Sequence, residues 1–337
     1  MPYSVEVDWA PAYELETSLL TLVFYRRYAK TLDIGDRWVA RVREQGGKEL
    51  ADALASADGL YGGLDLLVWQ CPDKGTVEST LGWLSGLTAG EVYERMVPHM
   101  PDVPQNKRPS AVTSGGAGYV ESLEARTRMR NAPSGGGVAD LAGVRDRLVR
   151  LFMVWNRAYF QSVDPRVLAG LASDADSRRR LVGEIQPEDL IEDATCGVRL
   201  DPVNADVRVV LVPQYHLRPW NTYNVGRNLV FYHYPVDAVP PELGAPSPAL
   251  LHLTRALSDE NRLKMLRFLA SGPRSFTEVA KFSGLAKSTV HHHMVALRAA
   301  GLVRMHVHFG GGPDRYSLRP GALETMGASL VSYLKGE

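Results

Sequence analysis

The stretch FTEVAKFSGLAKSTVHHHMVALRAAGLV, residues 276–303, contains two helical patterns separated by a glycine. Ser275 precedes the first pattern as a natural N-cap, and Gly284 ends it with the residue that best tolerates the left-handed backbone of a tight turn. The second pattern runs from Ala286 to Ala300 and is terminated by Gly301. The stretch therefore predicts two short helices joined by a tight turn.

The second of these helices has two distinct faces. Val290, Met294 and Leu297 recur at helical spacing and are expected to pack inward. Its exposed side is predicted to present Lys287, Ser288, Thr289, His291 and His292. Adjacent helical residues point about 100° apart, so three consecutive histidines cannot close on one metal ion. We expect His293 to lie toward the packing side.

The flanking segments complete a small module. Residues 250–270 hold two helical patterns separated by Ser258, the predicted N-cap of the second, in which Leu263, Leu266 and Leu269 form an inward stripe. After Gly301, alternating residues in 302–309 and the run 316–319 predict a two-stranded hairpin with a glycine-rich tip.

A final helix from Pro320 carries more apolar surface than a terminal helix normally leaves exposed. Its apolar residues are Leu323, Met326, Leu330, Tyr333 and Leu334. The pattern indicates a surface that another chain covers.

Charge divides unevenly at the Pro-rich segment 238–249. Residues 250–337 contain 12 Lys and Arg against 6 Asp and Glu, whereas residues 1–249 contain 26 against 32. A basic module attached to an acidic region favours a polyanionic partner for the module alone.

The carboxy-terminal residues resemble the arsenical-repressor-type (ArsR) winged helix-turn-helix regulators. The matching stretches are ALSDENRLKMLRFLA (256–270), the stretch at 276–303, and the hairpin ending in DRYSL (314–318). The resemblance is confined to residues 250–337. It implies that the second helix of the turn enters the major groove of double-stranded DNA and that the hairpin is a wing. It also implies a homodimer, paired through the first and last helices of the module, on an imperfect inverted repeat.

The sequence departs from the metal sensors of that family. The first helix of the turn has no cysteine and the last helix has no histidine. His306 and His308 share one side of a wing strand, but two ligands without a third are more typical of solvated or phosphate-facing histidines. No metal and no cofactor are expected.

The predicted DNA contacts combine the exposed helix face with nearby cations. Imidazoles can exchange hydrogen bonds with bases, and in the charged form they pair with phosphate, so affinity is expected to rise as pH falls from about 8 to 6. Lys287 and the arginines are expected to contact phosphates. The full set is Lys287, Ser288, Thr289, His291, His292, Arg298, Arg304 and Arg315.

Residues 1–237 are predicted to form an α-rich domain with a small antiparallel sheet. Helical patterns dominate from Ala12 to about Ile185, and short β-branched and aromatic runs follow. These runs are 197–200, 207–215 and 228–236, which residues 4–9 could extend. The expected fold class is α+β, mostly α, with a linker at 238–249 and the winged helix-turn-helix at 250–337.

Four aromatic residues in the amino-terminal region could line an apolar cavity for a small organic effector, or could simply form core. They are Tyr25, Trp69, Trp155 and Tyr159. The glycine clusters 113–118 and 134–137 lack the Lys-Ser/Thr ending of a phosphate-binding loop and are interpreted as loops. No catalytic motif occurs, and the acidic residues of 188–193 resemble a solvated helix face, so no enzyme activity is expected.

The amino terminus lacks a signal-peptide pattern, and no apolar stretch approaches the roughly 20 residues of a membrane span, so a cytoplasmic protein is expected. The sequence favours a homodimeric, DNA-binding transcriptional repressor. Two alternatives stay open: a winged helix that serves protein contacts, and an enzyme fused to a regulator domain.

Overall fold

The computed structural model describes residues 3–29, 32–58, 60–96, 143–200, 207–225, 229–307 and 314–336. Its helices are α1 (Pro11–Tyr28), α2 (Asp36–Ser56), α3 (Leu64–Trp69), α4 (Val77–Gly86), α5 (Ala89–Met96), α8 (Val144–Ala158), the 3-10 turn η3 (Phe160–Ser162), α9 (Pro165–Arg179), α10 (Pro187–Ala194), α11 (Pro248–Leu257), α12 (Glu260–Ala270), α13 (Phe276–Ser283), α14 (Lys287–Ala299) and α15 (Ala322–Lys335). Its strands are β1 (Tyr3–Val7), β2 (Val198–Leu200), β3 (Val207–Gln214), β4 (Thr222–Val225), β5 (Leu229–Pro235), β6 (Arg274–Ser275), β7 (Val303–Val307) and β8 (Arg315–Leu318). The predicted class, α+β and mostly α, is confirmed. Both glycine clusters and the tip of the hairpin lie outside the described residues.

The sheet of the amino-terminal region has the strand order β1-β3-β5-β4. The expected strand at the amino terminus joins it, as β1. The prediction of antiparallel pairing is wrong, because β1 with β3 and β3 with β5 pair in parallel, and only β4 with β5 is antiparallel. Parallel strands need both faces covered, and the nearly continuous apolar runs of β3 and β5 meet that need.

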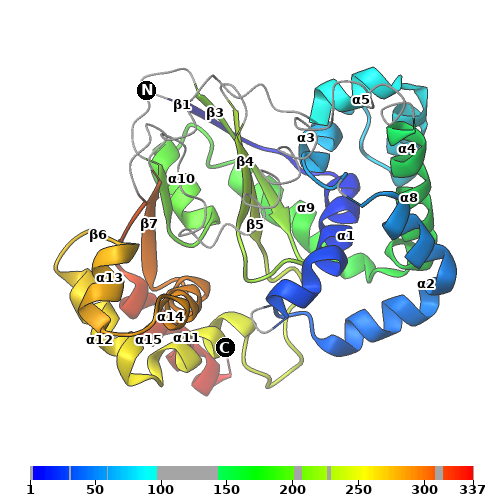
Figure 1. The fold of residues 1–337 in the computed structure, drawn as a ribbon. Helices are drawn as coiled ribbons and strands as arrows, with labels where there is room; N and C mark the ends of the chain where they lie inside the picture. Colours follow the sequence, from blue (N-terminus) through cyan, green and yellow to red (C-terminus); the bar gives the residue numbers. More distant parts are fainter. Residues whose placement is uncertain are drawn as a thin grey trace.

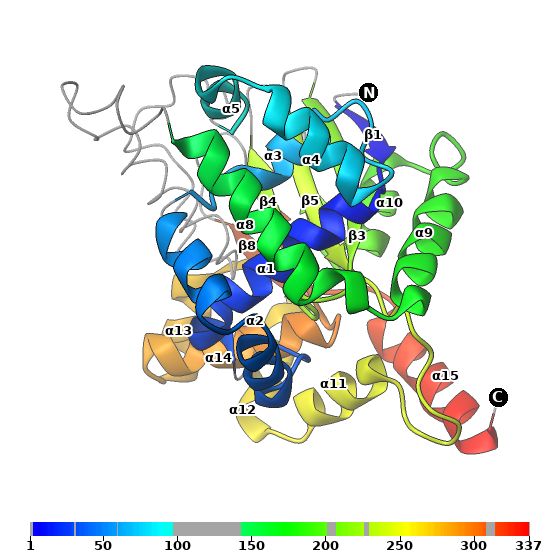
Figure 2. The same cartoon turned by 90° about the vertical axis from the view of Figure 1, so that its right-hand side faces the viewer.

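Helices cover both faces of this sheet (Figure 2). Val210 and Val212 of β3 pack with Tyr13 of α1 and with residues of α3. Alternate residues of the same strand, Val209 and Leu211, pack with residues of α9 and α10. The two-residue period of the strand thus sends successive side chains into two cores.

A third core is formed mainly by helices. It contains buried residues of α1, α2, α4, α5 and α8, with Trp155 of α8 fully buried among them. Figure 1 shows this helical layer on the right, beside the sheet. Helix α1 therefore lies between the sheet and the helical layer, in contact with both.

The carboxy-terminal sheet has the order β2-β7-β8-β6. The predicted hairpin is confirmed as β7 and β8, which pair antiparallel. Residues 197–200 were expected in the amino-terminal sheet, and this is wrong: β2 pairs in parallel with β7, with Val198 opposite Met305 and Leu200 opposite Val307. The region before the linker thus supplies a strand to the sheet of the hairpin.

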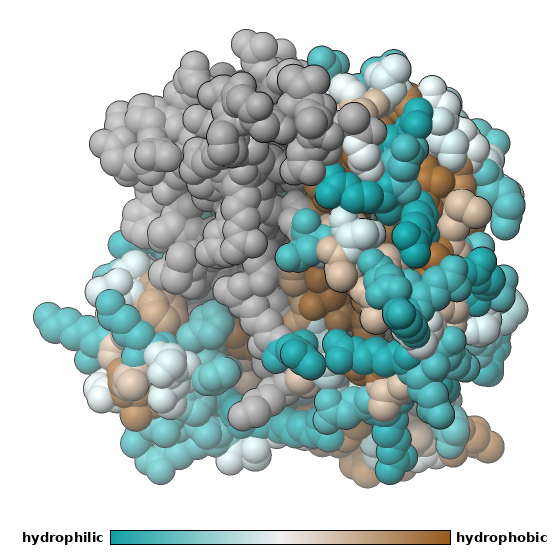
Figure 3. All heavy atoms as spheres, turned by 45° about the vertical axis from the view of Figure 1, so that its right-hand side comes forward, coloured by the Kyte–Doolittle hydropathy of each residue, from teal (hydrophilic) through white to brown (hydrophobic). Residues whose placement is uncertain are grey.

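The described surface is mainly hydrophilic on the face shown in Figure 3, with small hydrophobic patches between polar side chains. Among the described helices, none combines the length and the apolar character that crossing a membrane requires.

Candidate nucleic-acid interface

The two helices predicted around Gly284 are α13 and α14 (Figure 1, lower left). Ser275 caps α13, since its backbone N–H donates to Glu278 Oε2 at 2.8 Å and its hydroxyl accepts from the Glu278 N–H at 3.3 Å. Gly284 ends α13 with a φ of 67°. The predicted ends of both helices are confirmed to within a residue, because capping chemistry is local.

Helix α14 divides as predicted into a buried and an exposed side. Val290, Met294 and Leu297 are buried. Lys287, Ser288, Thr289 and His292 are exposed. His291 is half-buried, and its ring meets Phe276 of α13 edge-on, with centroids 6.5 Å apart. The exposed side lies on one helix and can follow a groove of a duplex.

The amino-terminal end of α14 is suited to a phosphate. Its N-cap is Ala286, whose side chain has no acceptor for the first backbone N–H groups. These N–H groups and the adjacent Lys287 supply donors and positive charge at one place.

The three histidines have different environments. Burial lowers the pKa of His291, and the charges of His292 and Arg298 act in the same direction. His293 Nδ1 lies 3.8 Å from Asp259 Oδ1, and its side chain is 13% exposed. His293 therefore faces the packing side, as predicted.

The helix that precedes α13 differs from the prediction in two details. Ser258 is the C-cap of α11, and the N-cap of α12 is Asp259, whose carboxylate accepts from the Arg262 N–H at 3.0 Å. Leu263 is 48% exposed, and Met265 is buried in its place, beside Leu266 and Leu269 as predicted.

Two of the predicted arginines lie beside the α13–α14 pair. Arg315 of β8 is 47% exposed, and its guanidinium lies 3.6 Å from Glu278 Oε2 of α13. Arg298, in the last turn of α14, lowers the pKa of the buried Tyr316 of β8, against the larger effect of burial. Both side chains place positive charge between α14 and the hairpin.

The structure assigns Arg304 to an internal ion pair, contrary to its predicted phosphate contact. Its Nε and Nη2 donate to Glu192 Oε1 of α10 at 2.8 and 2.7 Å. Arg199 of β2 lies 3.2 Å from the other oxygen of Glu192. Glu192 is 7% exposed, so its assignment to a solvated helix face is wrong. Arg304 connects the hairpin to α10.

The described residues offer no cluster of three or more His, Cys, Asp or Glu side chains arranged to hold a metal ion. His306 Nε2 lies 2.9 Å from the hydroxyl of Ser317 on the neighbouring strand. His308 lies outside the described residues.

The family model of a helix-turn-helix domain matches residues 257–306, which span α12, α13, α14 and most of β7. The chain contains a helix-turn-helix domain. The match supports DNA binding by this domain. The chain matches no curated protein and no solved structure.

The structure brings together two of the four aromatic residues predicted to surround an effector: the rings of Trp155 and Tyr159 have centroids 5.0 Å apart. Trp155 is fully buried and donates its N–H to Leu15 O at 3.1 Å, whereas Tyr25 donates its hydroxyl to Asp36 at 3.0 Å. Trp69 packs elsewhere, with the Arg208 guanidinium 4.6 Å from its ring. Tyr159 alone of the four lines a cavity of about 570 Å³.

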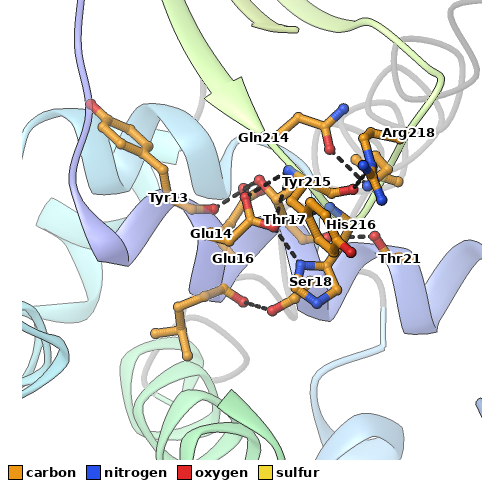
Figure 4. Close-up of polar contacts among 12 residues, drawn as sticks. Tyr13, Glu14, Glu16, Thr17, Ser18, Thr21, Gln214, Tyr215, His216 and Arg218 are labelled. Atoms are coloured by element: carbon orange, nitrogen blue, oxygen red, sulfur yellow. Dashed lines mark hydrogen bonds and ion pairs between the residues drawn. The ribbon is translucent and has the colours of Figure 1, made fainter. Parts of the chain in front are cut away.

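Two residues that line the cavity, His216 and Tyr159, belong to a hydrogen-bonded chain that begins at Glu14. Glu14 of α1 is fully buried and accepts from the backbone N–H of Tyr215 at 3.1 Å and of His216 at 3.1 Å. Figure 4 shows Glu14 and the His216 imidazole pointing toward each other, and Nδ1 bonds the same carboxylate. The other ring nitrogen, Nε2, lies 2.5 Å from the Tyr159 hydroxyl and forms a hydrogen bond with it.

Sequence reasoning missed most of this site. Trp38 and Arg41 of α2 line the cavity together with Tyr215, His216 and Arg218 from the segment after β3. The available signal for this site was the run ELETS (14–18) in helix α1, which places Glu14 among apolar residues. A buried carboxylate such as Glu14 needs a hydrogen-bonding partner, and this need points to a polar site nearby. The partner lies 202 residues away in the chain.

Proposed function

We propose that this chain is a DNA-binding transcriptional regulator of the ArsR type that acts as a homodimeric repressor on an inverted repeat. The observation that carries the proposal is α14, which presents Lys287, Ser288, Thr289 and His292 on one exposed side within a helix-turn-helix domain. Side chains of this kind can reach base edges while Lys287 and Arg315 contact the backbone.

Helix α15 supports the homodimer. Its exposed apolar residues are Leu323, Leu330, Val331, Tyr333 and Leu334. One helix-turn-helix module buries too little DNA for tight specific binding, so two linked copies are needed. Contact between the α15 helices of two chains would supply that link. A small organic effector in the amino-terminal region would adjust the distance between the two α14 helices of the dimer.

Fluorescence anisotropy tests the proposal. The full chain is titrated onto labelled DNA from upstream of its own gene and onto a scrambled duplex, at several salt concentrations. We expect tighter, salt-dependent binding to the first duplex, with two chains per site. Substitution of Thr289 and His292 by alanine should remove the preference between the duplexes. Equal, weak binding to both, with no site recovered by a genome-wide selection, would instead favour a protein-interaction module.

A further inference from the structure

The cavity of about 570 Å³ in the amino-terminal region has the size of a ligand site. Its walls come from the segment before α2, from α2, from the segment around η3 and from residues 215–218. These segments are fixed by internal bonds: the Asp33 N–H donates to Arg218 O at 2.9 Å, and the Leu217 N–H donates to Gln214 Oε1 at 2.7 Å. A cavity with fixed walls is preorganised for one shape of ligand.

Aromatic rings form one wall. The rings of Trp38 and Tyr159 meet edge-on with centroids 5.3 Å apart, and His216 lies 5.5 Å from Tyr159 in a similar orientation. Burial raises the pKa of Tyr159 to about 12, so its hydroxyl stays protonated at neutral pH and bonded to His216. The chain from Glu14 through His216 thus holds this wall in one orientation.

The polar groups of the aromatic wall act on one another. Trp38 is 6% exposed, and its indole N–H lies close enough to the Tyr159 hydroxyl to lower the pKa of that group, against the larger effect of burial. The same hydroxyl lies 2.5 Å from His216 Nε2. The wall therefore offers a ligand its ring faces and edges.

The ion pairs at the cavity leave one arginine without an ion-pair partner among the described residues. Asp33 is paired with His252 at 2.7 Å, Asp164 with Arg166 at 2.6 Å, and Arg218 with Asp237 at 2.7 Å. Arg41 lines the same cavity, and no described residue forms an ion pair with it. Arg41 also acts on the pKa of Tyr159, which places its charge near the aromatic wall.

We propose that this cavity binds a small planar organic anion, an aromatic carboxylate of two or three fused rings, with the carboxylate on Arg41. The rings would lie against Trp38 and Tyr159. This proposal assigns the effector of the proposed regulator a binding site and a chemical class. Its regulatory part rests on the proposed function.

The cavity is connected to the helix-turn-helix domain through Asp33. The carboxylate of Asp33 accepts from His252 Nε2 of α11 at 2.7 Å, and the two side chains are 19% and 20% exposed. Helix α11 packs against α14. A ligand that displaces Asp33 or Arg218 would therefore change the contact between α11 and the amino-terminal region.

Calorimetric titration of the full chain without DNA tests the site. The probes are 2-naphthoate and 2-naphthamide, which match in shape and differ in charge. We expect 2-naphthoate to bind about tenfold or more tightly than the amide, and Arg41→Gln to remove that preference. Arg43→Gln is the matched control, since Arg43 is exposed on the same helix and does not line the cavity. Absence of 2-naphthoate binding, equal binding of the amide, or an equal effect of Arg43→Gln would overturn the site.

Anisotropy on the operator duplex tests the connection. We expect 2-naphthoate to change the DNA affinity by about fivefold or more, and His252→Ala to bind the probe but lose the change. Probe binding without any effect on DNA affinity would overturn the connection and leave the site standing. Failure of the full chain to bind DNA without the probe would contradict the proposed function alone.

Discussion

At the scale of single residues, two arginines of the hairpin show what a sequence pattern cannot tell. Arg304 and Arg315 both stand on strands beside the second helix of the turn, and both were predicted to contact phosphate. Arg304 bonds Glu192 and is 20% exposed, whereas Arg315 is 47% exposed. The difference arises from a carboxylate 112 residues earlier in the chain, which no local pattern could reveal.

The two arginines should therefore respond differently to substitution. Arg315→Ala should weaken binding to every duplex and reduce the slope of log affinity against log salt by about 0.9, the value for one lost phosphate contact. Arg304→Ala should leave that slope unchanged and lower the free energy of unfolding by about 1–3 kcal/mol, because Glu192 loses a partner. Salt-dependent anisotropy and thermal unfolding check both. Equal salt slopes for wild type and Arg315→Ala would remove Arg315 from the interface.

Titration of His291 gives a prediction with a defined sign. Its pKa in the free protein is lowered by burial, so at pH 7–8 it is neutral. Nearby phosphates raise the pKa in the complex, so binding takes up a proton. Affinity should thus rise as pH falls from about 8 to 6, by at most about tenfold per pH unit for one proton. His291→Asn should flatten this dependence at fixed salt.

A control for this experiment follows from the same pKa. A histidine with a lowered folded-state pKa costs stability as pH falls below its unfolded value of about 6.5. Circular dichroism at each pH must therefore show a folded protein. A flat affinity profile in folded protein would exclude a role of His291 protonation in binding.

At the scale of elements, local chemistry was predictable and strand pairing was not. The cap at Ser275 and the turn at Gly284 depend on neighbouring residues, and both were predicted correctly. Whether β3 and β5 pair in parallel depends on how the chain between them runs, which no local pattern reveals. Short strands separated by loops are typical of hairpins, and the antiparallel prediction followed from that pattern. The apolar runs 209–212 and 229–232 were the available signal, since strands buried on both faces lack alternation.

The unit formed by α10 and β2 yields a prediction at the same scale. Glu192 of α10 holds Arg199 of β2 and Arg304 of β7, so one carboxylate connects three elements. Glu192→Gln keeps the shape and removes the charge, and should lower the free energy of unfolding by about 1–3 kcal/mol. Denaturant unfolding measures the loss. Glu184→Gln, at an exposed position before α10, should change nothing, and an equal loss in both variants would contradict the role of Glu192.

At the scale of the whole molecule, the cavity was the least predictable feature. The cavity wall combines residues of α2, of the segment around η3 and of residues 215–218, which meet only after the amino-terminal region has folded. Of the four aromatic residues that the sequence suggested, Tyr159 lines it, whereas Tyr25 and Trp155 pack in the helical core and Trp69 packs at the sheet. The apolar side of α15, by contrast, was visible in the sequence as a helical period without a partner.

The assembly predicted from α15 can be tested by a single substitution. Leu334 is 73% exposed, so Leu334→Glu should leave each chain folded, yet it would place two carboxylates in a symmetric interface. Losing one apolar side chain per copy costs about 1.5–3 kcal/mol each, before the charges are counted. Sedimentation should show the variant near the mass of one chain, 37.1 kDa, with weakened binding to the full repeat but unchanged binding to a half-site. Leu243→Glu, at a fully exposed position of the linker, is the control. A Leu334→Glu protein that remains dimeric would show that the two chains meet elsewhere.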